Sequence, residues 1–206
     1  MVIELSELSK RYGKEWIIKN ISYTISESDR VAILGPNGSG KSTLLQIISG
    51  ASSPSSGSIQ FYNQNQLLNV EDVFNNMSIA APYLELIEEM SLEEMLNFHF
   101  QFKKRLNNLS NEDLITLLDL KSSINKEIRN YSSGMKQRCK LLLAIMSDVE
   151  LILLDEPCSN LDKQGIEWYH TLLNKYLSNR TLIVCSNQEY EYSMCTKSVH
   201  VMDYKI

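Results

Sequence analysis

The chain has 206 residues and a net charge of -5, with 43% hydrophobic and 22% charged residues. This length favours one domain, and the composition excludes a disordered or collagen-like chain. The negative charge argues against broad nucleic-acid binding, because counterion release requires a basic protein surface. The longest apolar run, residues 141–146, is far shorter than the ~18 residues of a membrane helix. We expect a cytoplasmic protein with no signal peptide or membrane segment.

The cysteines are widely spaced, with no Cys-x-x-Cys pair, and the three histidines form no local cluster. Structural zinc sites and redox dithiols depend on such close pairs. We therefore expect buried free thiols in a reducing compartment. The four thiols are Cys139, Cys158, Cys185 and Cys195.

The first third of the chain is predicted to contain strands and one helix. Residues 2–5 and 17–25 mix β-branched and aromatic residues with polar ones, which is typical of strands. Residues 31–34 form a short apolar run that ends at a glycine, as expected of a buried parallel strand. Apolar residues at helical spacing predict a helix over residues 42–48, and the Ser-, Pro- and Gly-rich residues 51–57 predict a loop.

The middle of the chain is predicted to be helical. Ser91 and Glu94 fit a capping box at the start of one helix, and Ser110 begins a second. A third helix is expected over residues 133–146. The expected inward faces carry Leu92, Met95, Leu96, His99 and Phe102 in the first helix and Leu114, Leu117 and Leu118 in the second.

Apolar strands return at residues 151–154 and 182–184, so strands flank a helical insertion. This order predicts an α/β fold in which a parallel sheet carries a helical subdomain. We expect a single domain over residues 1–206, with a core of approximately 1–82 and 148–206 and a helical insertion of approximately 88–147.

A glycine-rich segment after the third expected strand matches the pattern G-x-x-x-x-G-K-[ST] of phosphate-binding loops. Glycines let backbone N–H groups approach phosphate oxygens, and the following helix adds the positive end of its dipole. In this pattern Lys41 reaches the β- and γ-phosphates and the Ser42 hydroxyl binds Mg²⁺. A glycine-rich turn that matches by chance is the alternative, but the flanking strand and helix favour a phosphate site. The expected phosphate-binding residues are Gly35, Pro36, Asn37, Gly38, Ser39, Gly40, Lys41, Ser42 and Thr43.

Two carboxylates, Asp155 and Glu156, end the apolar strand at residues 151–154. A strand end beside a phosphate loop is where a Mg²⁺-directing aspartate belongs, so Ser42 and Asp155 are the expected metal ligands. Glu156 is expected to polarise the attacking water as a general base. Taken alone, the same run is also compatible with a strand followed by a polar turn.

These motifs resemble the nucleotide-binding subunit of ATP-binding-cassette (ABC) transporters across essentially the whole chain. Residues 131–135, Tyr-Ser-Ser-Gly-Met, are similar to the LSGGQ signature of the family, and residues 157–162 resemble the segment that leads into its D-loop. Tyr12 stands where the family has an aromatic residue that stacks on adenine. The resemblance implies a P-loop NTPase core with a mixed, largely parallel sheet, an N-terminal antiparallel β subdomain and an inserted α-helical subdomain.

The resemblance also implies a dimer, because two cassettes of this family meet head to tail around two ATP molecules. It implies that Ser132, Ser133, Gly134 and Asp162 help to bind the nucleotide, the signature contacting the γ-phosphate held by the other subunit. An ordinary helix cap is the alternative for Ser132. The implied cofactors are ATP and Mg²⁺. The implied partners are a second ATPase subunit and an integral membrane permease, which would hold the chain at the inner face of the cell membrane.

The sequence departs from the family at three places. Pro82 stands where the family has a glutamine that serves the metal or its water, and Asn187 stands where it has the switch histidine. Ser133 and Met135 replace the second glycine and the glutamine of the signature. An asparagine amide can donate a hydrogen bond to the γ-phosphate as a neutral imidazole does, but it does not titrate near pH 7.

Activity is nevertheless expected, because the catalytic groups Lys41 and Glu156 are present and Asn187 is a workable substitute. The acidic residues 85–89 are expected either to face the membrane partner or to form a solvated loop.

The leading function is an ATPase that powers a separate permease. A soluble assembly or regulatory factor is one alternative, and a poorly hydrolysing ATP-binding module in an asymmetric dimer is another. DNA-clamping members of the family carry long coiled coils, and the chain has no sustained heptad repeat.

Overall fold

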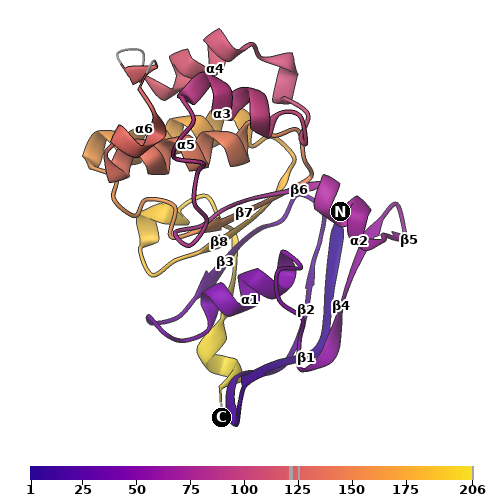
Figure 1. Ribbon diagram of the computed structural model, residues 1–206. Helices are drawn as coiled ribbons and strands as arrows, with labels where there is room; N and C mark the ends of the chain where they lie inside the picture. Colours follow the sequence, from indigo (N-terminus) through magenta and orange to yellow (C-terminus); the bar gives the residue numbers. More distant parts are fainter. Residues whose placement is uncertain (121–122, 125, 206) are drawn as a thin grey trace. The chain divides into compact units, whose positions relative to one another are not determined.

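The computed structural model describes residues 1–120, 123–124 and 126–205, and the chain divides into two compact units (Figure 1). The first unit comprises Met1–Ile79, Glu150–Glu156 and Asn179–Ile206. The second comprises Ala80–Val149 and Pro157–Ser178. Each unit is described by itself below.

The first unit begins with an antiparallel sheet in the order β2-β1-β4-β5. Its long strands β1 (Val2–Tyr12) and β2 (Glu15–Ile25) extend the two strands predicted at residues 2–5 and 17–25. The shorter strands β4 (Ser56–Asn63) and β5 (Gln66–Leu67) were not predicted. Alternation along β1 places Ile3 opposite Ile25 on one side and Phe61 on the other, so apolar residues meet across all three strands.

A second sheet has the order β6-β7-β8-β3-β9. Strands β7 (Leu151–Asp155) and β8 (Thr181–Cys185) are parallel neighbours and completely buried, which explains why they are continuous apolar runs. Strand β3 (Arg30–Leu34) pairs in parallel with β8 and with β9 (Lys197–His200). The edge strand β6 (Met77–Ala80) follows the short helix α2 (Val70–Asn75). The predicted parallel α/β sheet is therefore correct.

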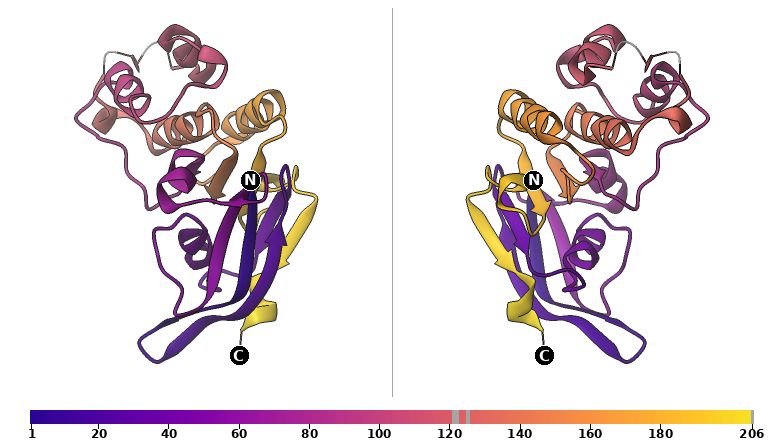
Figure 2. Two further views of the ribbon diagram at one scale, coloured as in Figure 1. Left: turned by 90° about the vertical axis from the view of Figure 1, so that its right-hand side faces the viewer. Right: turned by 90° about the vertical axis from the view of Figure 1, so that its left-hand side faces the viewer.

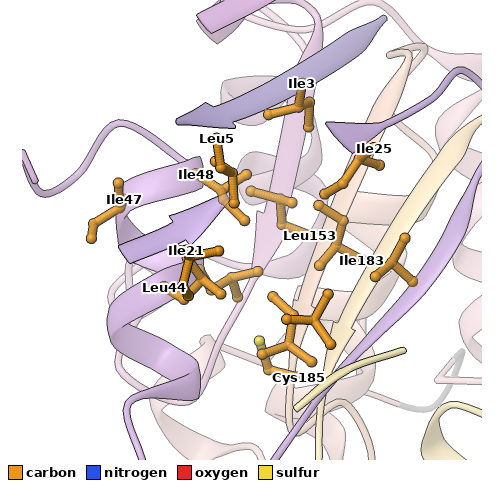
Figure 3. Close-up of a cluster of buried hydrophobic side chains, with 14 of the residues drawn as sticks. Ile3, Leu5, Ile21, Ile25, Leu44, Ile47, Ile48, Leu153, Ile183 and Cys185 are labelled. Atoms are coloured by element: carbon orange, nitrogen blue, oxygen red, sulfur yellow. The ribbon is translucent and has the colours of Figure 1, made fainter. Parts of the chain in front are cut away.

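The helix α1 (Lys41–Ile48) lies between these two sheets (Figures 1 and 2). Its apolar face, the inner face of the antiparallel sheet and one face of the parallel sheet form one buried cluster (Figure 3). Burial of this apolar area is the main favourable contribution to the stability of the unit. The side chains labelled in Figure 3 are Ile3, Leu5, Ile21, Ile25, Leu44, Ile47, Ile48, Leu153, Ile183 and Cys185.

The loop between β3 and α1 packs against β2. Gly40, the last residue of this loop, has a φ of 107°. A Cβ at this position would lie 2.7 Å from Cγ2 of Ile17 and 3.3 Å from Cγ1 of Ile18. Both the backbone conformation and the close approach of β2 therefore require glycine.

The second unit contains the helices α3 (Leu92–His99), α4 (Asn111–Leu118), α5 (Ser133–Ile145) and α6 (Lys163–Tyr176). The capping box that was predicted at Ser91 is confirmed, and Ser110 caps α4 in the same way with Asp113. Helix α6 was not predicted. The short turns η1 (Leu106–Asn108) and η3 (Ile128–Asn130) lie between these helices in the sequence.

The prediction that Phe102 lies on the inward face of the first helix was wrong. Leu92, Met95 and Leu96 are buried, but Phe102 is 62% exposed. Helix α3 ends at His99, so helical periodicity no longer applies three residues later. In α4, Leu117 is only half-buried.

The cysteines are all free, as predicted. Cys139, Cys158 and Cys185 are buried, whereas Cys195 is half-buried. Burial raises the pKa of Cys139 to about 12, which keeps this thiol protonated and unreactive near neutral pH. No helix in the described part of the chain combines the length and the apolar character needed to cross a bilayer.

His99 lies at the end of α3 with its Nε2 3.0 Å from Oγ of Ser147. Ser147 Oγ donates to the carbonyl oxygen of Leu143 at 2.7 Å, so it accepts a hydrogen bond from the neutral imidazole. Burial, with the nearby charge of Lys103, lowers the pKa of His99 to about 4.

The Gly40 contact predicts a difference between two glycine substitutions in the same loop. Gly38 also has positive φ, but a Cβ there meets nothing within 4 Å. Gly38→Ala is expected to cost about 1–2 kcal/mol for the left-handed backbone. Gly40→Ala adds about 1–3 kcal/mol of overpacking against Ile17 and Ile18. Urea unfolding without nucleotide measures both, and equal losses would contradict this packing.

The pKa of His99 predicts a specific acid sensitivity. Because the folded state holds this histidine below its ordinary value of 6.5, protonation favours unfolding. This destabilisation is absent above about pH 7. It grows as pH falls from about 6.5 to about 4 and lowers the free energy of unfolding by at most about 3 kcal/mol. His99→Gln should remove this part of the pH dependence of the free energy of unfolding. Substitution of the exposed His200 by Gln is the control, and identical pH profiles for wild type and His99→Gln would refute the assignment.

Candidate functional site

The phosphate-loop residues 35–40 connect the carboxyl end of β3 to α1. The loop is closed by a hydrogen bond from Ser39 N–H to Pro36 O at 3.1 Å, and α1 begins with Leu44 N–H donating to Gly40 O at 2.9 Å. Gly40 is the N-cap residue and makes no side-chain cap hydrogen bond. The first N–H groups of α1 thus have no capping side chain, which is the arrangement that binds anions at helix N-termini.

Lys41 bends back over this loop although it is only 5% exposed. Its Nζ donates to Gly35 O at 2.8 Å and to Pro36 O at 3.3 Å. Neutral carbonyl groups satisfy its hydrogen bonds, and Asp155 lies close enough for the two charges to interact. The loop therefore holds a nearly buried positive charge that favours an anionic ligand.

The two expected metal ligands, Ser42 and Asp155, are brought together. The Ser42 side chain makes a hydrogen bond with Asp155, which lies at the carboxyl end of β7. Burial raises the pKa of Asp155, while the Ser42 hydrogen bond and the charge of Lys41 act in the opposite direction. Among the described residues, Asp155 Oδ1 is a buried oxygen that has no hydrogen-bond partner.

This pair of oxygen ligands fits Mg²⁺, which is commonly held by one or two protein oxygens together with substrate phosphates. No group of three or more His, Cys, Asp or Glu residues in the described ranges could hold a metal ion.

Glu156 directly follows the buried strand β7 and is half-buried. Its backbone has φ of 44°, and its N–H donates to Cys185 O at 2.9 Å. The Cys185 thiol in turn donates to Lys41 O at 3.6 Å. These bonds tie the ends of β7 and β8 to the start of α1, so Glu156 stands on a rigid turn beside Asp155.

Asn187 follows β8 and its side chain reaches the phosphate loop. Its Nδ2 donates to Oδ1 of Asn37 at 2.7 Å. The buried residue before it, Ser186, accepts from Gln188 N–H at 2.8 Å and donates to the carboxylate of Glu191 in the turn η4 (Glu189–Glu191). These bonds hold the turn that carries Asn187.

Sequence reasoning named Asn37 and Asn187 separately but missed that they form a pair. It also missed Ser186 and Glu191, because a polar turn after a strand gives no local signal that one of its carboxylates is buried.

Tyr12 lies at the end of β1, opposite Glu15 of β2, and is 51% exposed. The Nζ of Lys10 lies 5.1 Å from its ring centroid. The same β1–β2 hairpin packs against Gly40 through Ile17 and Ile18. The aromatic ring is thus displayed on the hairpin that supports the phosphate loop.

The remaining expected binding residues belong to the second unit. Ser132 is the N-cap of α5, and its Oγ accepts from Met135 N–H at 3.2 Å, so the helix-cap interpretation of this side chain holds. Ser132 and Ser133 are exposed. A Cβ on Gly134 would lie 2.9 Å from Asn160 O, so this position requires glycine.

Other bonds fix the segment that contains Asn160. The Nε2 of Gln137 donates to Pro157 O at 2.7 Å, within the second unit. Asp162 caps α6 by accepting from Gly165 N–H at 2.8 Å. The signature residues therefore begin α5 and Asp162 begins α6, and Gln137 of α5 anchors the segment that leads into α6.

Pro82 begins the loop that leads to α3, and α5 holds this loop in place. The Nζ of Lys140 donates to Pro82 O at 3.3 Å, and Lys136 pairs with Glu88 at 2.5 Å. One carboxylate of the acidic residues 85–89 is thus already paired inside the second unit.

Comparison with known proteins places this arrangement in one family. A family model described as "ABC transporter" matches residues 18–159. An ABC transporter ATP-binding protein of Bacillus subtilis, YcbN, is 26% identical over 98% of this chain and 66% of its own length. The spermidine/putrescine import ATP-binding protein PotA of Legionella pneumophila (strain Philadelphia 1) is 30% identical over 96% of this chain and 56% of its own.

The chain spans between about half and two thirds of the length of these curated relatives. Solved structures agree with the fold. The dimeric structure of a bacterial ABC transporter cassette superposes with a TM-score of 0.81 at 25% identity, covering 97% of this chain and 94% of that one. An ATP-binding protein from Pyrococcus furiosus gives 0.80 at 22% identity, with both chains fully covered. The match of the family model over most of the chain shows that it belongs to the ABC transporter family of ATP-binding cassettes.

Proposed function

We propose that this chain binds ATP with Mg²⁺ on its phosphate loop and hydrolyses it as the energy-coupling subunit of a transporter. One observation carries the proposal: the nearly buried ammonium of Lys41 lies near a buried oxygen of Asp155 that has no hydrogen-bond partner among the described residues. Both groups are costly without a ligand, and a metal-bound phosphate chain satisfies both.

Each residue of the site has a role that its position supports. Lys41 exchanges its carbonyl partners Gly35 and Pro36 for the oxygens of the β- and γ-phosphates. A magnesium ion held by Ser42 and Asp155 supplies neutralisation of the negative charge on the phosphates. Glu156 accepts the proton of the attacking water.

Asn187 contributes a neutral hydrogen bond to the γ-phosphate. Its amide gives up Asn37 for the phosphate oxygen when nucleotide binds. Because an amide does not titrate near neutral pH, this contribution does not change with pH, unlike that of a histidine. Tyr12 offers an exposed ring on which the adenine base stacks.

The second half of each nucleotide site comes from another cassette in this proposal. Ser132, Ser133 and Gly134 lie at an exposed helix start, with backbone N–H groups suited to a γ-phosphate, and Asp162 begins the next helix. The dimeric structure of the related bacterial cassette supports this arrangement. ATP then joins two cassettes, and hydrolysis separates them.

A membrane permease is the proposed recipient of this motion. The relatives include ATP-binding proteins named for spermidine/putrescine import and for Nod factor export, so cassettes similar to this one serve both directions of transport. In this proposal the transported substrate crosses the membrane through a separate subunit.

Substitution of Glu156 tests the catalytic part. Glu156→Gln removes the proton acceptor but preserves shape, so turnover of Mg–ATP is expected to fall about 10²- to 10⁴-fold. ATP affinity should stay within a few fold, because the phosphate contacts remain. Steady-state phosphate release and equilibrium binding of a fluorescent ATP analogue measure the two quantities.

Lys41→Ala is the matched variant, and it is expected to lose most of its affinity for ATP because it lacks the ammonium that contacts the phosphates. Equal turnover by wild type and Glu156→Gln would refute the assignment of Glu156. Retention of affinity by Lys41→Ala would refute the phosphate loop as the binding site.

Association with a permease is tested by tagging the chain in its native cell and solubilising the membranes gently. We expect an integral membrane protein to co-purify in fixed ratio, and Lys41→Ala to retain it, since docking does not require nucleotide. Recovery of the wild-type chain without any membrane protein would favour a soluble assembly or regulatory factor.

A further inference from the structure

An aromatic and basic segment stands out on the second unit of this acidic chain. Residues 98–105 read Phe-His-Phe-Gln-Phe-Lys-Lys-Arg, placing three consecutive cations after three aromatic residues. The segment is rigidly held, because Asp148 N–H donates to Lys104 O at 2.9 Å and Leu106 N–H to Met146 O at 2.8 Å. The side chains of the segment are therefore presented by an ordered backbone.

Two of the phenylalanines face solvent. Phe98 is 37% exposed and Phe102 is 62% exposed. Their rings meet edge to face, with centroids 5.3 Å apart and an interplanar angle of 68°. Exposure of such a pair is unfavourable in water and is typical of a surface that binds an apolar phase or a partner.

Two of the three cations beside this pair, Lys104 and Arg105, have no carboxylate partner among the described residues. Arg105 donates to Leu109 O at 3.1 Å and to Asn111 Oδ1 at 2.6 Å, so neutral groups hold its guanidinium without compensating its charge. Lys104 has no ion pair with any described residue.

A cavity of about 620 Å³ opens between the aromatic residues and the cations. It is lined by Phe100, Phe102 and the three cations, and Asp148 is the one acidic residue among its described lining residues. The exposed pair Phe98 and Phe102 thus lies beside a locally positive surface, although the net charge of the whole chain is -5.

We propose that residues 98–105 form a docking surface for an anionic phospholipid bilayer. Phe98 and Phe102 enter the interface between headgroups and acyl chains, and Lys103, Lys104 and Arg105 meet the lipid phosphates. The combination of an apolar pair with adjacent cations is complementary to this interface. The contact gives the chain its own attachment to the membrane, in addition to any permease, and it does not depend on ATP hydrolysis.

Nucleic acid is a less suitable occupant. The two rings form a compact wedge rather than parallel platforms for successive bases, and the positive surface is short.

Sedimentation with vesicles tests the proposal on the full purified chain. We expect pelleting with phosphatidylcholine vesicles that contain 30% phosphatidylglycerol and none with pure phosphatidylcholine vesicles. The double variant Lys103→Gln/Lys104→Gln should lower the partition coefficient roughly 20- to 30-fold, about fivefold per cation. Phe102→Ser should lower it several-fold at unchanged charge.

The control is Lys19→Gln/Lys175→Gln, which makes the same change in net charge at two exposed lysines elsewhere. It should bind anionic vesicles as the wild type does, and circular dichroism confirms that every variant is folded. If the control loses as much vesicle binding as the Lys103→Gln/Lys104→Gln variant, non-specific attraction explains the binding and the proposal is wrong. If Phe102→Ser binds as the wild type does, the aromatic pair does not enter the bilayer. If the wild type does not bind anionic vesicles, the bilayer proposal is wrong. An acidic protein surface would then be the better candidate for the partner of residues 98–105.

Discussion

The site depends on polar groups buried beside the parallel sheet without complete partners. Asp155 is 1% exposed, its burial raises its pKa, and one of its oxygens finds no hydrogen-bond partner in the described part of the chain. Lys41 is nearly as buried, and its ammonium donates to two neutral carbonyl groups, those of Gly35 and Pro36. A folded protein retains such groups at a cost of about 1–3 kcal/mol for each unsatisfied atom. The fully buried strands β7 and β8 supply the packing that keeps this edge in place.

Much of this edge was predictable from the sequence, because its signals are local. The glycine-rich loop, Lys41, and the carboxylates after an apolar run all lie within short segments of fixed spacing. The capping box at Ser91 was predictable for the same reason, since it depends on two residues three positions apart.

What sequence reasoning missed depends on contacts between distant segments. Asn37 and Asn187 are 150 residues apart, and Ser186 needs the buried Glu191 to hold its turn. Helix α6 is an exception, because its buried residues Tyr169, Leu172 and Leu173 stand at helical spacing after the N-cap Asp162, so its signal was local and was overlooked. Phe102 was assigned to the core because helical periodicity was carried past the actual end of α3, and its exposure made it part of the proposed lipid-binding surface.

Two of the residues that differ from the family pattern, Pro82 and Asn187, lie in segments that hydrogen bonds hold in place. Asn187 is held against the phosphate loop, and the backbone at Pro82 is held by Lys140. The second unit carries the signature residues at the start of α5, so each chain contains both of the elements that we propose to bind nucleotide. Our central claim is that two such chains, one offering the phosphate loop and the other the signature, enclose ATP.

The most direct test is a structure of the Glu156→Gln chain crystallised with ATP and Mg²⁺. We predict a dimer in which the phosphates lie on residues 35–43 of one chain, the metal lies on Ser42 and Asp155, and Ser132–Gly134 of the second chain contact the γ-phosphate. Nucleotide bound elsewhere, or bound to this loop in a monomer with no second chain over it, would contradict the account.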